Sequence, residues 1–246
     1  MKSLLTITLL LFATFTAMTQ ERALAQAEFD RVFTASRDIW TVWKGRAFRK
    51  TLTVETTSPK QSYKVSRVVE FDGKGASRAV SNEYIEGKEH RLIREIIGVG
   101  STHYIRDVAR GNWWMRGDTQ PEESHANLAY APDPLEVQAI QAHYVRSQFN
   151  RISSETSYAF IGGEQIKNEP VTVYKATERI KGREKKSGFE METDAVVKYW
   201  FGADGIILRS ESISNGYIGK DVYYLKITAI WELDPTITIT PPVPPT

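Results

Sequence analysis

The stretch Asp221–Thr246, DVYYLKITAIWELDPTITITPPVPPT, decides the fold class of this chain. Its apolar residues fall on every second position: Tyr223, Leu225, Ile227, Ala229, Trp231 and Leu233. Successive side chains of a strand point to opposite faces, so this period predicts a strand with one strongly apolar face. Asp234-Pro235 is expected to end the strand, because proline has no N–H to donate to a neighbour. We therefore expect a mainly β protein in which an open antiparallel sheet buries one face.

Alternating segments and turn signals elsewhere in the chain extend this sheet. Asp72–Gly75, DGKG, and Gly202–Gly205, GADG, predict hairpin turns between strands. The close spacing of such turns describes a meander, in which each strand pairs with its predecessor, and predicts about nine to eleven antiparallel strands. The segment 180–194, IKGREKKSGFEMETD, is highly charged and is predicted to be an exposed, mobile loop.

Two segments show helical patterns instead. Phe29 and Phe33 lie at helical spacing and predict a helix over 27–38. Asp133-Pro134 supplies an N-cap and a first helical residue for a second helix over 134–151. The apolar residues of this second helix lie on more than one side, so packing on a sheet would leave one apolar side in need of cover.

The N-terminus carries the pattern of a secretory signal peptide. Lys2 precedes an apolar run of about 15 residues, which is shorter than the roughly 20 that a bilayer-spanning helix needs. Ala23-Leu24-Ala25 fits the small-x-small cleavage pattern. We predict a signal peptide over 1–25, one domain over 26–240 and a proline-rich C-terminal tail over 241–246. No other stretch is as apolar, so the mature chain is expected to have no transmembrane segment.

The composition limits which cellular compartment and which binding partners are expected. The chain has no cysteine, so it has neither disulfides nor the cysteine that a bacterial lipoprotein acylates. We expect a periplasmic or secreted protein that is free rather than lipid-anchored. The net charge of +2 creates no strong field, so nucleic acid is not an expected partner.

No motif in the sequence predicts catalysis. The G-x-S-x-G, H-E-x-x-H and Walker A patterns are all absent. The four histidines are far apart in the sequence and are better explained as surface or singly hydrogen-bonded residues: His90, His103, His125 and His143. We therefore expect no enzyme, no cofactor and no metal site.

Two hairpins and the closing strand resemble those of a known family. Ser101–Gly117, STHYIRDVARGNWWMRG, and Val196–Ser212, VVKYWFGADGIILRSES, are similar to two hairpins of the LolA-like superfamily. This superfamily of periplasmic lipoprotein carriers and lipid-binding proteins includes the LppX/LprG envelope proteins and the sensor domain of RseB. The resemblance implies a single curved, incompletely closed antiparallel half-barrel, with helices plugging its concave face. The sequence has no clear equivalent of the buried arginine that locks the lipoprotein carrier closed.

The resemblance implies binding of an amphiphilic ligand, a lipid or a lipoprotein acyl chain, in an apolar cavity between sheet and helices. The alternative is an envelope sensor or interaction module of the RseB type, which binds a protein partner. Envelope proteins are therefore a second class of expected partner. The basic part of 180–194 is either a solvated loop or the cavity mouth, where its charges would meet anionic headgroups. The residues predicted to line the cavity are Val137, Ile140, Tyr144, Trp113, Phe189, Met191, Leu225 and Ile227.

Overall fold

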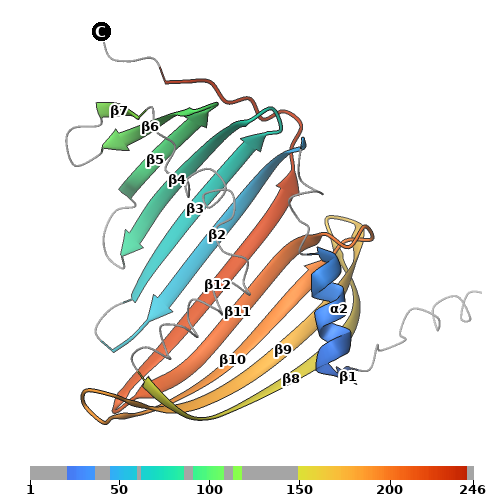
Figure 1. Ribbon diagram of the computed structural model, residues 1–246, viewed down its shortest axis with the longest axis vertical. Helices are drawn as coiled ribbons and strands as arrows, with labels where there is room; N and C mark the ends of the chain where they lie inside the picture. Colours follow the sequence, from blue (N-terminus) through green and yellow to red (C-terminus); the bar gives the residue numbers. More distant parts are fainter. Residues whose placement is uncertain are drawn as a thin grey trace, which may run out of the picture.

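The computed structural model describes residues 21–36, 45–59, 62–85, 91–107, 113–117 and 149–242. These residues form one twelve-stranded sheet and one helix (Figure 1). The strands are β1 (Arg22–Leu24), β2 (Ala47–Thr57), β3 (Ser62–Asp72), β4 (Ala76–Ile85), β5 (Arg91–Val99), β6 (Thr102–Asp107), β7 (Trp113–Gly117), β8 (Phe149–Ile166), β9 (Glu169–Glu184), β10 (Glu190–Phe201), β11 (Ile207–Ile218) and β12 (Asp221–Leu233). The helix is α2 (Gln26–Ser36). The predicted mainly β fold with one open antiparallel sheet is confirmed, although its twelve strands exceed the predicted nine to eleven.

The strand order is β1-β8-β9-β10-β11-β12-β2-β3-β4-β5-β6-β7, and every neighbouring pair is antiparallel. The sheet therefore consists of two meanders, β2–β7 and β8–β12, with β1 added at the edge beside β8. They join where β12 pairs with β2, with Ile227 opposite Val54. The closing strand thus lies in the middle of the sheet rather than at an edge.

One face of β12 is buried, as its alternation predicts. Ile227, Ala229 and Trp231 are 7%, 1% and 6% exposed. Leu233 continues this row in register, opposite Phe48, but its predicted inward burial is wrong, because 56% of its surface is exposed. It is the last residue of the strand, directly before the Asp234-Pro235 break, so few neighbours surround it.

The predicted helix over 27–38 is confirmed as α2, which packs against the β8–β10 part of the sheet (Figure 1). The Phe33 ring lies 4.5 Å from the rings of both Phe29 and Tyr199, measured between centroids. At the start of the helix, the Glu28 N–H donates to the Ala25 carbonyl and the Ala25 N–H donates to the Glu28 carboxylate. This reciprocal pair resembles a capping box and satisfies backbone donors of the first turn.

The predicted signal-peptide cleavage site, after Ala25, lies directly before α2. Cleavage after Ala25 would remove β1, whose Ala23 pairs with Ala159 of β8. Residues 1–20 lie outside the described residues, so the predicted cleavage stays a prediction.

The second predicted helix, over 134–151, lies outside the described residues except at its end. There the prediction is wrong, because β8 begins at Phe149, opposite Glu184 of β9. Backbone pairing with a neighbouring strand overrides a local helical pattern when the two compete. Within the described ranges α2 is the only helix.

The segment 180–194 was predicted to be a mobile loop, and this is wrong for most of its length. It forms the end of β9, a turn over 185–189 and the start of β10. Cross-strand ion pairs explain why so charged a segment is a hairpin, since opposite charges on facing strands stabilise their pairing. The ion pairs join Arg179 to Asp194 at 2.7 Å, Lys181 to Glu192 at 3.3 Å and Arg183 to Glu190 at 3.5 Å.

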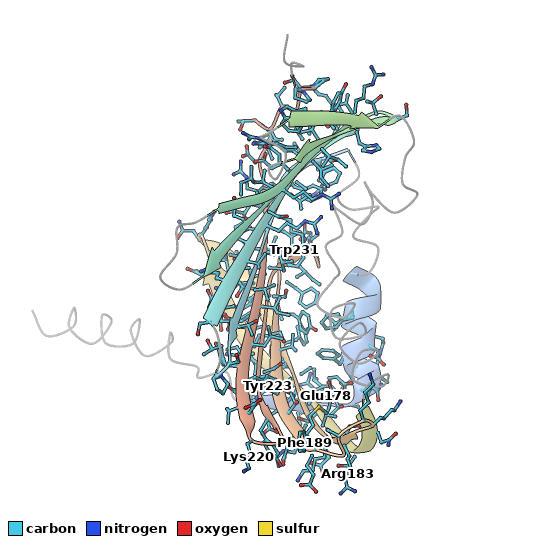
Figure 2. The ribbon with its side chains drawn as sticks, turned by 90° about the vertical axis from the view of Figure 1, so that its left-hand side faces the viewer. Glu178, Arg183, Phe189, Lys220, Tyr223 and Trp231 are labelled. Carbon is cyan, nitrogen blue, oxygen red and sulfur yellow. The ribbon has the colours of Figure 1, made fainter. Side chains whose placement is uncertain are left out.

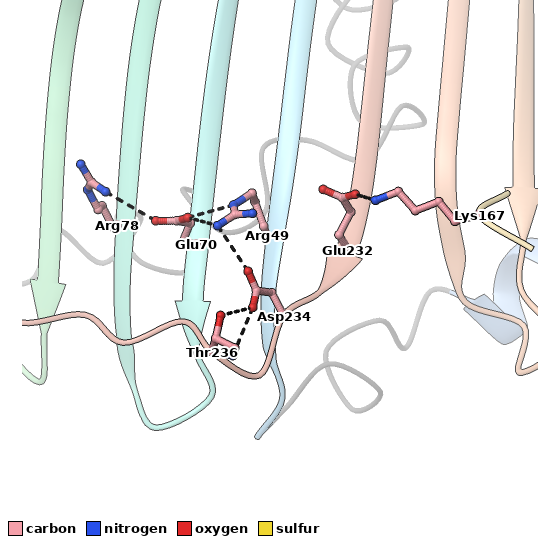
Figure 3. A network of polar contacts seen from close by, with 7 residues as sticks. All are labelled: Arg49, Glu70, Arg78, Lys167, Glu232, Asp234 and Thr236. Atoms are coloured by element: carbon pink, nitrogen blue, oxygen red, sulfur yellow. Dashed lines mark hydrogen bonds and ion pairs between the residues drawn. The ribbon is translucent and has the colours of Figure 1, made fainter. Parts of the chain in front are cut away.

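Further ion pairs cross the outer face of the sheet, the face away from α2 (Figure 3). Arg49 lies 2.8 Å from Glu70 and 3.4 Å from Asp234, and Arg78 lies 3.7 Å from Glu70. Asp234 also accepts hydrogen bonds from the backbone N–H and the hydroxyl of Thr236, which fixes the chain where the sheet ends. These two hydrogen bonds, with the nearby Arg49 guanidinium, hold the pKa of Asp234 below its usual value.

We expect stability to fall in acid through three carboxylates with lowered pKa values. They are Asp194, Asp234 and Glu211; burial opposes the shift in Glu211, and its ion pairs with Lys226 and Arg209 outweigh it. A lowered folded-state pKa contributes stability above the unfolded values of 3.8 and 4.5, and this is lost as pH falls through the folded values. Urea denaturation at about pH 5 and pH 3 should show this loss.

The matched control for this pH dependence is a pair of Asp→Asn variants. Asp234→Asn should reduce the loss between the two pH values. Asp221→Asn changes an exposed aspartate that has no ion-pair partner among the described residues, and it should leave the loss unchanged. A free energy of unfolding that is equal at both pH values would contradict the expectation.

Candidate ligand-binding site

The inner face of the sheet, which we define as the face that contacts α2, contains most of the core. Its residues are identified by strand register, since directly opposed residues point to the same face. Tyr199 of β10 contacts α2 through Phe33 and stands opposite Ser210 of β11, which stands opposite Ala229 of β12. The apolar row of β12 therefore faces the same side as α2.

Strand β11 presents only small residues to the middle of this face. Ser210, Ser212 and Ser214 are 1%, 8% and 6% exposed, and Gly216 continues the row. Larger side chains of β10 and β12 flank them; Ser212, for example, lies between Val197 and Ile227. Sequence reasoning missed this row, although SESISNG over 210–216 carries its period-2 signal.

The Tyr223 side chain crosses this row at Gly216, near the β11–β12 turn. Its hydroxyl makes a hydrogen bond with the hydroxyl of Thr193 on β10, two strands away. The crossing requires glycine at 216, because a Cβ there would lie 2.6 Å from the tyrosine oxygen and 2.5 Å from the backbone oxygen of Glu192. Burial raises the pKa of the Tyr223 phenol above its ordinary value.

A pocket of about 950 Å³ opens at this end of the sheet. Three turns form it: the turn after β2, the β9–β10 turn and the β11–β12 turn. Its lining residues are Ser58, Pro59, Phe189, Glu190, Gly219, Lys220, Asp221, Val222 and Tyr223. Figure 2 shows Phe189, Lys220 and Tyr223 gathered at this end, with Trp231 farther along the sheet. Tyr223 belongs both to the pocket lining and to the inner-face row of β12, so the two features adjoin.

The structure brings part of the predicted site together. Phe189 lines the pocket and is 58% exposed, while Met191 is buried at 3% on the inner face. Ile227 is buried and Leu225 half-buried in the β12 row beyond Tyr223. Phe189 is in the β9–β10 turn, Met191 is at the start of β10, and Leu225 and Ile227 are on β12.

Of the other four predicted residues, the structure describes only the backbone of Trp113. Trp113 begins β7, an edge strand six positions from β12 in the sheet order, which is roughly 29 Å at 4.8 Å per strand. Its side chain lies outside the described part of the structure, as do Val137, Ile140 and Tyr144. Sequence reasoning also missed Ser58, Pro59 and the Lys220–Val222 turn, because only the sheet topology places them beside Phe189.

The pocket lining combines apolar and charged side chains. An aromatic ring, an aliphatic side chain and a tyrosine share it with one lysine and two carboxylates. Within the described ranges, no three metal-ligating side chains lie close enough to hold an ion. In the same ranges, no helix has both the length and the apolar character to cross a membrane.

No protein-family model and no curated protein sequence matches the chain. Solved structures of similar fold exist at low identity. A LolA superfamily protein from Nitrosomonas europaea is 10% identical, with a TM-score of 0.28, over 83% of this chain and 93% of its own. A DUF1329 family protein from Desulfovibrio piger is 7% identical, with a TM-score of 0.25, over 85% and 94%.

MucB in the Pseudomonas aeruginosa MucA/MucB complex is 9% identical, with a TM-score of 0.24, over 82% of this chain and 94% of its own. The chain is thus similar in structure to LolA superfamily, DUF1329 and MucB proteins at low identity.

Proposed function

We propose that this chain is an exported periplasmic or secreted binding or carrier protein for an amphiphile, without enzymatic activity. In this proposal the acyl chain of a lipid or lipoprotein lies along the inner face of a half-barrel of the LolA type. One observation supports it above all others. Tyr223 lines the pocket and also belongs to the inner-face row of β12, in which Leu225 and Ile227 are the next residues.

The small residues of β11 supply the second argument. Ser210, Ser212, Ser214 and Gly216 bring little side-chain volume to the strand between β10 and β12. An acyl chain lying along this row would contact the larger side chains on both sides, such as Val197 and Ile227. The serine hydroxyls do not exclude an apolar chain, since each can hydrogen-bond to nearby backbone.

Burial of an acyl chain can by itself supply the free energy of binding, so no covalent bond to the ligand is needed. Each buried methylene contributes roughly 0.8 kcal/mol, so a long acyl chain gains on the order of 10 kcal/mol. Lost translational and rotational freedom takes back several kcal/mol of this. The remainder, about 5–7 kcal/mol, corresponds to a dissociation constant of roughly 10–200 μM.

We expect Ser214→Phe to weaken binding of a fluorescent fatty-acid probe by about tenfold or more, because the ring would occupy the space next to Leu225. Fluorescence titration measures the dissociation constant. Asn215→Phe is the matched control, since the adjacent residue points to the outer face and is exposed. Urea denaturation of both variants shows whether the weakened binding reflects lost folding.

Wild-type protein purified from its host provides the direct test. We expect extraction with organic solvent, followed by mass spectrometry, to recover a bound lipid. If the protein carries no lipid and binds no fatty-acid probe, the carrier proposal fails. The interaction module that binds a protein partner then becomes the better account.

A further inference from the structure

The turns at the lower end of the sheet expose large apolar side chains. Phe189 is 58% exposed, Val222 is 64% exposed and Tyr217 is 37% exposed. Tyr217 and Val222 face each other across β11 and β12, and Phe189 lies in the next turn. Three exposed apolar residues at one end of a sheet form a patch, and such patches mark contact surfaces.

The backbone holds Phe189 in this exposed position. The Phe189 N–H donates to the Ser187 hydroxyl at 3.1 Å, and the Gly219 N–H donates to the Glu190 carbonyl at 2.8 Å. The second bond ties the β9–β10 turn to the β11–β12 turn. The Phe189 ring lies against Gly219, where an added Cβ would be 3.3 Å from a ring carbon. The ring is thus fixed by the fold rather than placed by a flexible chain.

Lysines outnumber the acidic residues around this patch, which also includes the exposed Asp221. The turn Lys185–Phe189, KKSGF, contains two lysines and no acid, and Lys220 lies in the adjacent turn. Higher up the hairpin, the charges of Lys181 and Arg183 are already paired with glutamates. Lys186 and Lys220 have no ion-pair partner among the described residues, so both are available to an external anion.

We infer that this tip, which we define as Lys185–Phe189 together with Tyr217–Val222, docks on an anionic phospholipid surface. Exposed aromatic and aliphatic side chains enter the headgroup region of a bilayer. There their apolar parts can contact acyl chains while their polar parts stay in water. Lysines beside them meet lipid phosphates, and each lysine near an anionic surface strengthens binding about fivefold. The combination of apolar and basic groups at one tip favours a membrane over an acidic protein, which would need only the charges.

The tip also lies at the proposed ligand entrance, since Phe189, Lys220 and Val222 line the pocket. Docking there would place the entrance against the membrane. The inference itself does not depend on the proposed function, because it rests on exposed residues of the turns alone.

Co-sedimentation with vesicles tests the inference. The full mature chain should sediment with phosphatidylcholine vesicles that contain about 30% phosphatidylglycerol, and much less with phosphatidylcholine alone. The double variant Lys186→Glu/Lys220→Glu should weaken this binding at least about tenfold. Lys74→Glu, which reverses an exposed lysine in the β3–β4 turn at the opposite end of the sheet, should change it less than about twofold.

A site-specific probe reports which end of the molecule touches lipid. Because the chain has no cysteine, Val222→Cys and Leu233→Cys each introduce a single thiol for an environment-sensitive dye. Both positions are exposed residues of β12, and roughly 36 Å of strand separates them. The dye at 222 should brighten and shift to shorter wavelength on anionic vesicles, whereas the dye at 233 should not change.

Two further variants separate the outcomes. Phe189→Ala should weaken vesicle binding about tenfold. Ser214→Phe should dock as wild type does, even though it is expected to lose the fatty-acid probe. Equal binding to neutral and anionic vesicles, a response of the dye at 233 instead of 222, or no sedimentation at all would overturn the inference. Vesicle binding that is lost in Ser214→Phe would also overturn it, since the inner face rather than the tip would then hold the lipid.

Discussion

Trp231→Ala should lower the free energy of unfolding by roughly 3–5 kcal/mol. The indole is 6% exposed on the inner face of the central strand β12, within the same core cluster as Phe48 and Ala229. Truncation removes this buried surface and leaves a cavity that the surrounding strands can fill only in part. The Nζ of Lys50 lies 4.7 Å from the centre of the ring, and Lys50 is itself 2% exposed. The variant therefore also removes a cation–π contact from a desolvated ammonium group.

Urea denaturation followed by circular dichroism measures this effect. Leu233→Ala is the matched control, because Leu233 is the next apolar residue of the same strand and is 56% exposed. Its substitution should change stability by less than about 0.5 kcal/mol. A loss below about 1 kcal/mol for Trp231→Ala would mean that the indole is not buried and that the register of β12 is wrong.

Phe33→Ala should have a similar effect, roughly 3–5 kcal/mol, through a different element. Phe33 is 2% exposed, and its ring contacts Phe29, Tyr199 and Phe201 with centroid distances of 4.5, 4.5 and 5.3 Å. It is a principal attachment of α2 to the sheet. An isolated helix of 11 residues is marginal in water, so α2 should leave the sheet once this attachment is weakened.

Two measurements separate these consequences. Denaturation gives the loss of stability, and hydrogen exchange shows whether the amides of 26–36 lose protection while those of β10 keep theirs. Phe189→Ala makes the same chemical change at a site that is 58% exposed, and it should alter stability by less than about 0.5 kcal/mol. Unchanged protection of 26–36 in Phe33→Ala would show that α2 is held by other contacts.

The features that the sequence predicted correctly are determined by residues close together in the chain. Alternation predicted β12 and its buried face, and the turn residues predicted where hairpins form. Asp72 illustrates this, since its carboxylate accepts hydrogen bonds from the N–H groups of Lys74 and Ala76 within the predicted turn. Spacing of Phe29 and Phe33 likewise predicted α2. Each of these features depends on residues that are close together in the sequence.

The incorrect predictions concern segments whose structure depends on a neighbouring strand that is distant in the sequence. The pattern over 149–151 suggested the end of a helix, yet pairing with β9 makes it a strand. The charges of 180–194 suggested a loop, yet Arg179, Lys181 and Arg183 each find an acid on the facing strand. Only the paired neighbour decides whether a charged alternating segment is a solvated loop or a hairpin.

The candidate site shows the same division. By itself, the sequence determined that the protein is mainly β, that β12 buries one face, and that Phe189 and Met191 are the apolar residues of a basic segment. Only the tertiary structure decided that β12 lies between β11 and β2, and that three turns distant in sequence meet around one pocket. The physical reason is that side-chain periodicity and turn chemistry act over a few residues, whereas strand order is chosen by pairing between segments that the chain brings together only on folding.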